Sequence, residues 1–251
     1  MGWGYDGYGY PPYVSVAERR ARAAREMAKL SKKGDPPQPI RIEGRAIART
    51  YWGKAWCDNL ESYSDFANRL PRGRTYVRNG SVVDLRIAAG HVRARVAGSS
   101  LYEVNVRLKP LAAPRWRALK LACTGKIASL IGLLRGKLSD DVLEVLAHSR
   151  TGLFPEPREL ELSCSCPDVA EMCKHVAATL YGVGALLDAK PELFFTLRQV
   201  DQTELLSAPA TVTRPKKAVK TIAKKKLADV FGIELENDEA PAAARPKKPR
   251  R

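Results

Sequence analysis

The sequence predicts an α+β fold, in which an N-terminal helix and an antiparallel β-meander with following helices precede a small unit rich in cysteine. Three observations support this prediction. Apolar residues recur at spacings of three and four over residues 51–70, which is typical of one helix face. They then alternate with polar residues between residues 81 and 108, which indicates strands. Three cysteines and a histidine fall within residues 164–175, which is typical of a metal-binding unit.

The first predicted core element is a helix from Tyr51 to Leu70. Its apolar stripe consists of Trp52, Ala55, Trp56, Leu60, Tyr63, Phe66, Ala67 and Leu70. We interpret the two tryptophans as core anchors rather than as ligand-stacking residues, because large aromatic side chains dominate core burial. Cys57 lies in the same helix without a second cysteine nearby, so we expect it to be an inert, buried thiol.

A meander of about four strands is predicted to follow. Asn79-Gly80 is a strong hairpin signal, since both residues tolerate the positive φ of a type I′ turn. Strand-like alternation then covers residues 81–87, 91–96 and 101–108. The residues expected to point inward are Val83, Leu85, Ile87, Val92, Ala94, Val96, Tyr102, Val104, Val106 and Leu108. This pattern predicts an antiparallel sheet with one covered and one uncovered face.

The uncovered face of this sheet and the stretch before it are rich in arginine. The stretch 69–78 packs four arginines around Tyr76. Arginine suits phosphate groups, and arginine beside an aromatic ring suits single-stranded bases. The candidate nucleic-acid-binding residues are Arg72, Arg74, Arg78, Arg86, Arg93 and Arg95. The alternative interpretation is a solvated sheet face whose charges resist edge-to-edge aggregation.

The composition of the 251-residue chain narrows the classes of partner and location. It holds 43 Lys and Arg against 27 Asp and Glu, a formal net charge of +16, which favours a polyanionic partner. No apolar run approaches the roughly 18–20 residues of a membrane span, and the start of the chain lacks the apolar stretch of a secretory signal. Five cysteines are an odd number for a disulfide framework. We therefore expect a cytoplasmic protein whose clustered cysteines bind metal.

The same patterns divide the chain into four predicted regions. These are a low-complexity and basic N-terminal segment (1–37), an α+β domain with the arginine-rich sheet face (38–150), a cysteine-bearing domain (151–207) and a disordered basic tail (208–251). Residues 1–34 carry a net charge of +4 and the tail carries +7, so most of the excess charge lies near the two ends. Two or three helices are expected over residues 116–146, with Ser139 as an N-terminal cap.

The sharpest signal is the cluster of three cysteines and one histidine. Cys164 and Cys166 are followed after six residues by Cys173, and His175 comes two positions later. These four ligands make a complete tetrahedral set for one zinc ion. Cys164 and Cys166 stand at strand spacing, which turns both side chains to one side. Cys173 and His175 fit the start of the apolar helix that follows, where exposed N–H groups favour a thiolate.

Other kinds of site fit this cluster less well. A redox pair would need C-x-x-C beside a βαβ unit, and an iron–sulfur site usually needs four cysteines. A catalytic zinc site keeps one coordination position open, whereas four ligands fill every position here. The rest of the sequence offers no constellation of acid, base and nucleophile. We therefore expect a structural zinc ion and a non-enzymatic protein.

The cluster resembles the SWIM zinc finger. The likeness lies in C-x-C, in Pro-Asp after the second cysteine and in Cys-Lys-His before an apolar helix, over about residues 159–197. It implies a ββα unit, two short strands followed by a helix. The zinc ligands that it implies are Cys164, Cys166, Cys173 and His175. Residues 52–57 and 72–80 also resemble the N-terminal part of bacterial SWIM zinc finger proteins, which are often associated with helicase-like ATPases of the SWI/SNF type.

Two functions follow as expectations. The first is a nucleic-acid-binding accessory factor, with DNA favoured, that uses the arginines and the basic ends. The second is a protein–protein interaction adaptor for a SWI/SNF-type helicase-like ATPase, which would use the apolar helix over residues 176–187. We favour burial of this helix in its own domain, because a small zinc module needs such a helix for its core. Neither function requires a membrane or a small-molecule substrate.

Overall fold

The structure is a computed structural model that describes residues 14–31, 35–63 and 67–207. All of these residues belong to one of the two compact units of the chain. Residues 1–13 of the predicted low-complexity N-terminal segment and the whole predicted disordered tail (208–251) lie outside the described residues. Within the described ranges, every helix is too short or too polar to cross a lipid bilayer.

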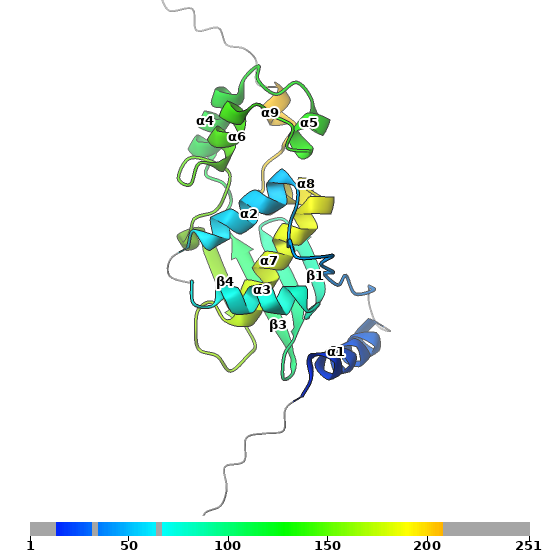
Figure 1. Ribbon diagram of the computed structural model, residues 1–251. Coiled ribbons are helices and arrows are strands. Elements are labelled where there is room, and N and C mark those ends of the chain that lie inside the picture. The colour runs from blue at the N-terminus through cyan, green and yellow to red at the C-terminus, as the bar shows by residue number, and fades with distance from the viewer. Residues whose placement is uncertain (1–13, 32–34, 64–66, 208–251) are drawn as a thin grey trace, which may run out of the picture. The chain divides into compact units, whose positions relative to one another are not determined.

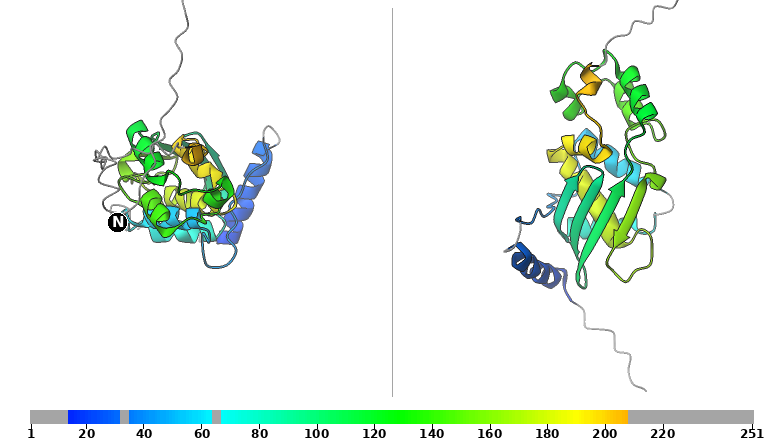
Figure 2. Two further views of the ribbon diagram at one scale, coloured as in Figure 1. Left: turned by 90° about the horizontal axis from the view of Figure 1, so that it is seen from above. Right: turned by 180° about the vertical axis from the view of Figure 1, so that it is seen from behind.

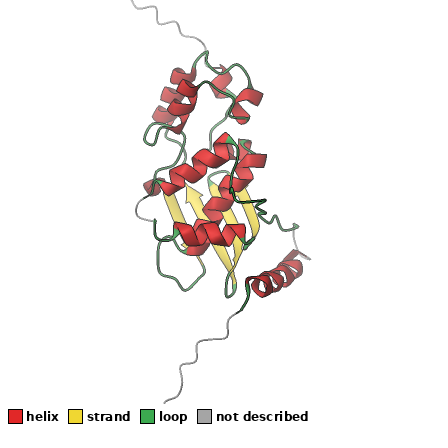
Figure 3. Ribbon diagram, viewed as in Figure 1, coloured by secondary structure: helices red, strands yellow, loops and turns green. Residues whose placement is uncertain are grey.

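A four-stranded antiparallel sheet lies at the centre, with the strand order β1-β2-β3-β4 (Figure 3). Its strands are β1 (Val82–Ala88), β2 (His91–Ala97), β3 (Leu101–Leu108) and β4 (Leu160–Cys164). The first three form the predicted meander, and β4 joins them from much later in the chain by pairing with β3. This architecture confirms the α+β class. The sheet runs continuously across the domain boundary predicted at residue 150, and that boundary stays a prediction.

Helices cover one face of the sheet (Figure 1). They are α2 (Tyr51–Glu61), α3 (Leu70–Arg78) and α7 (Lys174–Ala189). Helix α7 contacts all four strands, and α2 and α3 both pack on α7. The view from behind shows most of the opposite face open, with α1 beside the β1 edge, where it contacts β1 and β2 (Figure 2). The prediction of one covered and one uncovered face is therefore confirmed.

The other helices lie around this core. They are α1 (Val16–Ser31), α4 (Ala113–Cys123), α5 (Leu130–Leu134), α6 (Asp140–Ala147), the 3₁₀ helix η2 (Pro157–Glu159), α8 (Glu192–Arg198) and α9 (Glu204–Ser207). Ser139 is the N-cap residue of α6, as expected, with two acids in the first turn. Helix α9 is fastened to α4, because Glu204 accepts a hydrogen bond from Trp116 Nε1 at 3.2 Å and also pairs with Lys120.

The two tryptophans of α2 are core anchors, as predicted. Trp52 is fully buried and Trp56 is 3% exposed. The indole N–H of Trp52 donates to the carbonyl of Leu133 at 2.9 Å, and that of Trp56 donates to the carbonyl of Leu180 at 2.8 Å. The neighbouring Cys57 is half-buried rather than buried as expected. Its partial burial, together with the charge of Glu61, raises the pKa of this thiol to about 12, so it stays protonated near neutral pH.

A buried ion cluster holds the segment that leads into β4. Glu159 pairs with Arg198 at 3.0 Å and with Arg115 at 3.3 Å. Arg198 is fully buried and also donates to the carbonyl of Lys109 at 3.2 Å. Removing one partner from such a cluster would leave a buried charge uncompensated. The cluster therefore joins η2, α4 and α8 just before β4 begins.

The prediction of one helix from Tyr51 to Leu70 is wrong. Helix α2 ends at Glu61, and α3 begins at Leu70. Pro71 lies in the first turn of α3, and proline starts a helix readily but lacks the N–H that a helix interior needs. The buried residues of α3 are Leu70, Gly73 and Val77. The arginine-rich stretch before the sheet is therefore a helix with its own apolar side.

The prediction of a hairpin at Asn79-Gly80 is also wrong, because these residues end α3. The Ser81 N–H donates to the carbonyl of Tyr76 at 3.0 Å, and the Gly80 N–H donates to that of Val77 at 2.9 Å. This pair of bonds is the Schellman motif, which needs a left-handed residue after the helix. Gly80 supplies it with a φ of +65°. The same tolerance of positive φ serves hairpin turns and helix ends, so the sequence signal was ambiguous.

A β-bulge changes which residues of β1 point inward. The pairing with β2 shifts between Val82 and Asp84, so Val82 and Leu85 are fully buried, whereas the predicted Val83 is only half-buried. An extra residue in one strand bends it and breaks the two-residue period. The predicted inward residues that are buried as expected in β2 and β3 are Val92, Ala94, Val96, Tyr102, Val104, Val106 and Leu108.

Candidate metal centre and the arginines around it

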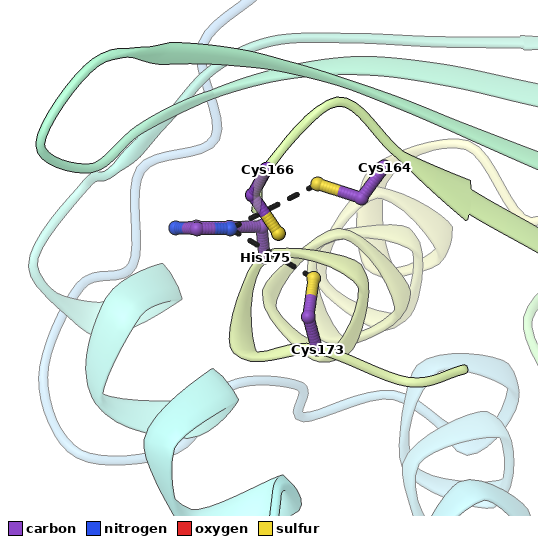
Figure 4. Close-up of side chains that lie close together, drawn as sticks. All are labelled: Cys164, Cys166, Cys173 and His175. Carbon is purple, nitrogen blue, oxygen red and sulfur yellow. Dashed lines mark hydrogen bonds between the residues drawn. The ribbon is translucent and has the colours of Figure 1, made fainter. Parts of the chain in front are cut away.

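The structure brings the four predicted ligands together (Figure 4). Cys164 ends β4, Cys166 lies in the loop that follows, Cys173 is the N-cap residue of α7 and His175 lies in the first turn of that helix. One ligand atom from each residue lies within 4.8 Å of the others. The Nδ1 atom of His175 is 3.8 Å from the sulfurs of Cys164 and Cys173.

These distances fit a tetrahedral zinc site. With Zn–S bonds of about 2.3 Å and a Zn–N bond of about 2.0 Å, neighbouring ligand atoms stand about 3.6–3.8 Å apart. Cys173 and His175 are buried, and Cys164 and Cys166 are half-buried, so the ligands are screened from bulk water. The residues that would hold the ion are the three cysteines, through Sγ, and His175, through Nδ1. Four such ligands leave no position for a reactive water, which is typical of a structural site.

The local backbone explains the two-residue spacing of Cys173 and His175. Cys173 has extended dihedral angles, φ −80° and ψ 170°, so it stands just outside α7 while His175 lies inside it. The pKa of Cys173 is lowered to about 3 by hydrogen bonds from the Cys164 thiol, the His175 ring and the Val176 N–H. The partner thiol of Cys164 has a raised pKa for the same reason. These contacts place donors around the Cys173 sulfur, which favours its thiolate form.

Three residues from other parts of the fold hold the ring of His175 in place: Tyr102, Tyr76 and Gly98. Tyr102 lies against it with ring centroids 4.5 Å apart, and Tyr76 meets it edge-on at 5.4 Å. A Cβ atom added at Gly98 would lie only 2.8 Å from His175 Nε2. His175 Nε2 is buried without a hydrogen-bond partner among the described residues. Packing thus directs Nδ1 toward the sulfurs.

Helix α3 contacts the segment that carries the ligands through an ion pair, a cation–π contact and close packing. Arg69, the N-cap residue of α3, pairs at 3.3 Å with Asp168 in the loop between Cys166 and Cys173. The ammonium group of Lys174 lies 5.5 Å from the ring centroid of Tyr76. The space at Gly73 is filled by Ala177 of α7, whose Cβ would be only 2.5 Å from an added Cβ. Sequence reasoning missed this role of α3, because it did not identify the helix.

The predicted nucleic-acid-binding arginines fall into two groups on different faces. Arg72, Arg74 and Arg78 lie on α3, on the helix-covered side of the sheet (Figure 1). Arg72 and Arg78 are exposed and have no ion-pair partner among the described residues, while Arg74 pairs with Glu61 at 3.3 Å. The cationic end of Arg74 also lies 5.9 Å from the ring centroid of Tyr181.

The second group, Arg86, Arg93 and Arg95, belongs to the uncovered sheet face. Two of its members are engaged by acids, as shown by these ion pairs: Arg86 with Asp35 (3.0 Å) and Asp84 (3.3 Å), and Arg95 with Glu103 (3.6 Å) and Asp84 (3.9 Å). Arg93 is exposed and has no ion-pair partner in the described part of the chain. Nucleic-acid binding by either group stays a prediction.

Comparisons with known proteins agree with the geometry of the metal centre. Residues 148–182 match the SWIM zinc finger, and this stretch contains all four ligands. The chain is 34% identical over 183 residues to Uncharacterized protein Rv2102 of Mycobacterium tuberculosis (strain ATCC 25618 / H37Rv). The alignment covers 68% of this chain and 66% of that protein, a little less than two thirds of the relative's length. No solved structure matches the chain.

Proposed function

The chain carries a SWIM zinc finger, and we propose that it is a non-enzymatic accessory protein in which one structural zinc ion holds α3 in place to bind nucleic acid, with DNA favoured. The observation that carries this proposal is the position of α3. Two exposed arginines without ion-pair partners among the described residues, Arg72 and Arg78, lie on a helix that packs directly against the residues of the metal centre.

The charge around α3 supports a polyanionic partner. Its basic residues are Arg69, Arg72, Arg74, Arg78 and Lys174, and the acids that pair with them are Glu61 and Asp168. The basic residues outnumber these acids, so the helix presents a local excess of positive charge. Arginine forks bind phosphate oxygens well, and an exposed helix fits the major groove of duplex DNA, which is about 12 Å wide. Such phosphate contacts supply affinity without sequence preference.

Contacts between α3 and the metal centre link the position of this helix to zinc. Arg69 pairs with the loop between the second and third cysteines, and Tyr76 packs against His175. Without metal, three thiols and an imidazole would have no common partner, and the loop would lose its main restraint. We therefore expect the position of α3, and with it the affinity for DNA, to depend on zinc.

The proposal is tested by replacing the two unpaired arginines of α3. We predict that Arg72→Gln with Arg78→Gln lowers the affinity for a fluorescent duplex oligonucleotide at 100 mM salt by about tenfold. The slope of log affinity against log salt should become shallower by about 2, because each lost phosphate contact releases about one counterion fewer. Fluorescence anisotropy over a salt series measures both quantities.

The matched control removes the same charge elsewhere. Arg117 and Arg135 are exposed, lie outside α3, and have no ion-pair partner among the described residues. The variant Arg117→Gln with Arg135→Gln should keep a duplex affinity within about twofold of that of the original chain. Equal losses in the two double variants would mean that only net charge matters. Absence of duplex binding by the original chain at low salt would reject the proposal.

The adaptor function finds less support in the contacts of α7. The residues of this helix over 176–187 are mostly buried, against α2, α3 and the sheet. This burial leaves α7 little surface for a partner. It agrees with the interpretation, favoured on the sequence alone, that the helix packs within its own domain. Recovery of an ATPase by the chain from nuclease-treated extract would support an adaptor using another surface, and loss of that recovery on nuclease treatment would support nucleic-acid binding.

A further inference from the structure

The uncovered face of the sheet is hollowed into a groove. One hollow, of about 700 Å³, spans all four strands from Asp35 and Met27 on one side to Ser163 on the other. A second hollow, of about 360 Å³, lies beside the turn between β1 and β2. Both hollows are lined by His91, Arg107 and Glu161, so they form one continuous groove, which we call the sheet groove.

A row of hydrogen-bond donors crosses the middle of the sheet groove. The strand register places these residues side by side, one on each strand: Arg86, Arg93, Asn105 and Ser163. All four line the larger hollow. Neighbouring strands stand about 4.8 Å apart, so the row is long enough for several groups of one extended ligand. None of its members is an acid. The Arg86 guanidinium already donates to Asp84, Asp35 and the carbonyl of Pro36, so Arg93 and Asn105 are the members that can donate to an oxygen of that ligand.

Arg86 and Arg93 form a like-charge pair directly across β1 and β2. Such a pair is destabilising in a sheet unless a counter-charge lies near it. Arg86 has Asp35 and Asp84 as counter-charges, whereas Arg93 has no ion-pair partner among the described residues. An anion bound at Arg93 would supply the counter-charge that this guanidinium lacks. The centre of the groove is therefore suited to a phosphate group.

The acids of the groove are arranged around this centre. Asp84 is engaged by Arg86 and Arg95, and Glu103 is engaged by Arg95. Glu161 stands opposite Arg107 in the register of β3 and β4, but the two make no ion pair within 4.0 Å. Arg93 pairs with Asn105 of β3, and Arg107 lies two residues further along that strand. Arg93 and Arg107 are therefore diagonal neighbours, with Cα atoms about 7–8 Å apart. That separation suits two successive phosphates of one strand.

We propose that the sheet groove binds the sugar–phosphate backbone of single-stranded nucleic acid. One phosphate lies against Arg93, the next lies toward Arg107, and Asn105 donates to the sugar–phosphate oxygens between them. No Phe, Tyr or Trp side chain lines either hollow in the described part of the chain, so binding depends on the backbone of the nucleic acid and has little base preference. A hollow of this volume encloses a few nucleotides of one strand but not a duplex.

This inference goes beyond the proposed function, because it assigns a second nucleic-acid surface. Helix α3 lies on the covered side of the sheet (Figure 1), and the residues that line the sheet groove belong to the opposite face. The two surfaces use different residues and different forms of nucleic acid. Each can therefore fail without the other.

The test uses two single variants of the full chain that change charge in opposite directions. Arg93→Gln should weaken binding of a fluorescent 12-nucleotide oligothymidine by about fivefold and make its salt slope shallower by about 0.7, the value for one phosphate contact to a single strand. Glu161→Gln should strengthen the same binding by about twofold, because it removes a negative charge from the groove. Binding of duplex DNA should stay within twofold in both variants.

Opposite changes on one face cannot arise from misfolding alone, since both side chains are exposed and a folding defect would weaken binding in both variants. The inference is overturned if Arg93→Gln leaves the oligothymidine affinity unchanged, or if Glu161→Gln lowers it. If nucleic-acid affinity falls only in the double variant of Arg72 and Arg78, that result would support the α3 surface and reject the groove. If nucleic-acid affinity falls with Arg93→Gln and stays unchanged in that double variant, the result would support the groove and reject the α3 surface.

Discussion

At the scale of single residues, His175 shows how packing selects a ligand atom. Its Nδ1 faces the sulfurs, while Nε2 is directed at Gly98 and Tyr102 packs along the ring. An imidazole held in this way needs no rearrangement to bind a metal. The absence of a side chain at Gly98 is therefore part of the metal centre, although Gly98 is not a ligand.

We predict that Gly98→Ala weakens zinc binding by about tenfold or more. The added Cβ would lie 2.8 Å from His175 Nε2 and 2.7 Å from Tyr102 Cε2, so the ring must shift away from the sulfurs. Residues that orient a metal ligand typically change metal affinity by about 10–100-fold. Gly98 does not have a positive φ, so alanine itself is compatible with the backbone.

Competition with a chromogenic chelator measures this effect. Gly132→Ala is the matched control, because its added Cβ would meet only the hydroxyl of Ser129 within 3.4 Å. The control should keep the zinc affinity of the original chain. An unchanged chelator midpoint for Gly98→Ala, in a protein with the original circular dichroism spectrum, would contradict the role given to Gly98.

The four ligands could be predicted from the sequence, because C-x-C and C-x-H supply a complete set of zinc ligands within twelve residues. The strand spacing expected of Cys164 and Cys166 is wrong in detail, because β4 ends at Cys164 and Cys166 lies in the loop that follows. The residues that support His175 could not be predicted in this way. Tyr76, Gly98 and Tyr102 come from α3 and from the turn and strand that lead into the sheet, far from the cluster along the chain. Tyr102 was expected only as an inward core residue, and no local pattern indicates which inward residue meets the histidine.

At the scale of elements, the crossing of α3 and α7 is the contact on which the proposed function depends. We predict that Gly73→Ala destabilises the protein by about 2–3 kcal/mol, a typical cost of overpacking a rigid contact. The added Cβ would lie 2.5 Å from Ala177 Cβ, 2.8 Å from its carbonyl carbon and 3.0 Å from the Ala178 nitrogen. These are backbone or short side-chain atoms, which cannot rotate away.

Urea unfolding followed by tryptophan fluorescence measures the change. Thr75→Ala on the exposed side of the same helix is the control and should change the free energy of unfolding by less than about 0.5 kcal/mol. If Gly73→Ala unfolds at the same urea concentration as the control, α3 and α7 are not packed as closely as described.

The elements themselves were only partly predictable. The period-two alternation identified β2 and β3 with their inward residues, because each strand is regular. It failed in β1, where the bulge between Val82 and Asp84 breaks the period. Asn79-Gly80 predicts a hairpin turn on the sequence alone, although glycine after the last helical residue also ends helices.

At the scale of the whole molecule, the sheet separates the arginines that the sequence grouped together. The α3 group lies on the covered side and the sheet group on the uncovered side (Figures 1 and 2). Acids neutralise much of the sheet group, so its local charge is lower than the arginine count suggests. The sequence reveals this only in part. Asp84 and Glu103 lie in the meander beside the arginines, whereas Asp35, which pairs with Arg86, comes from a segment before it.

The central claim is that Cys164, Cys166, Cys173 and His175 hold one structural zinc ion. Its most direct test is metal analysis by mass spectrometry of the full chain, purified under reducing conditions. We predict one zinc per chain, and close to none in Cys166→Ser, because that variant leaves only three of the four ligands. Zinc close to zero in the original chain, or a full equivalent retained by Cys166→Ser, would contradict the account.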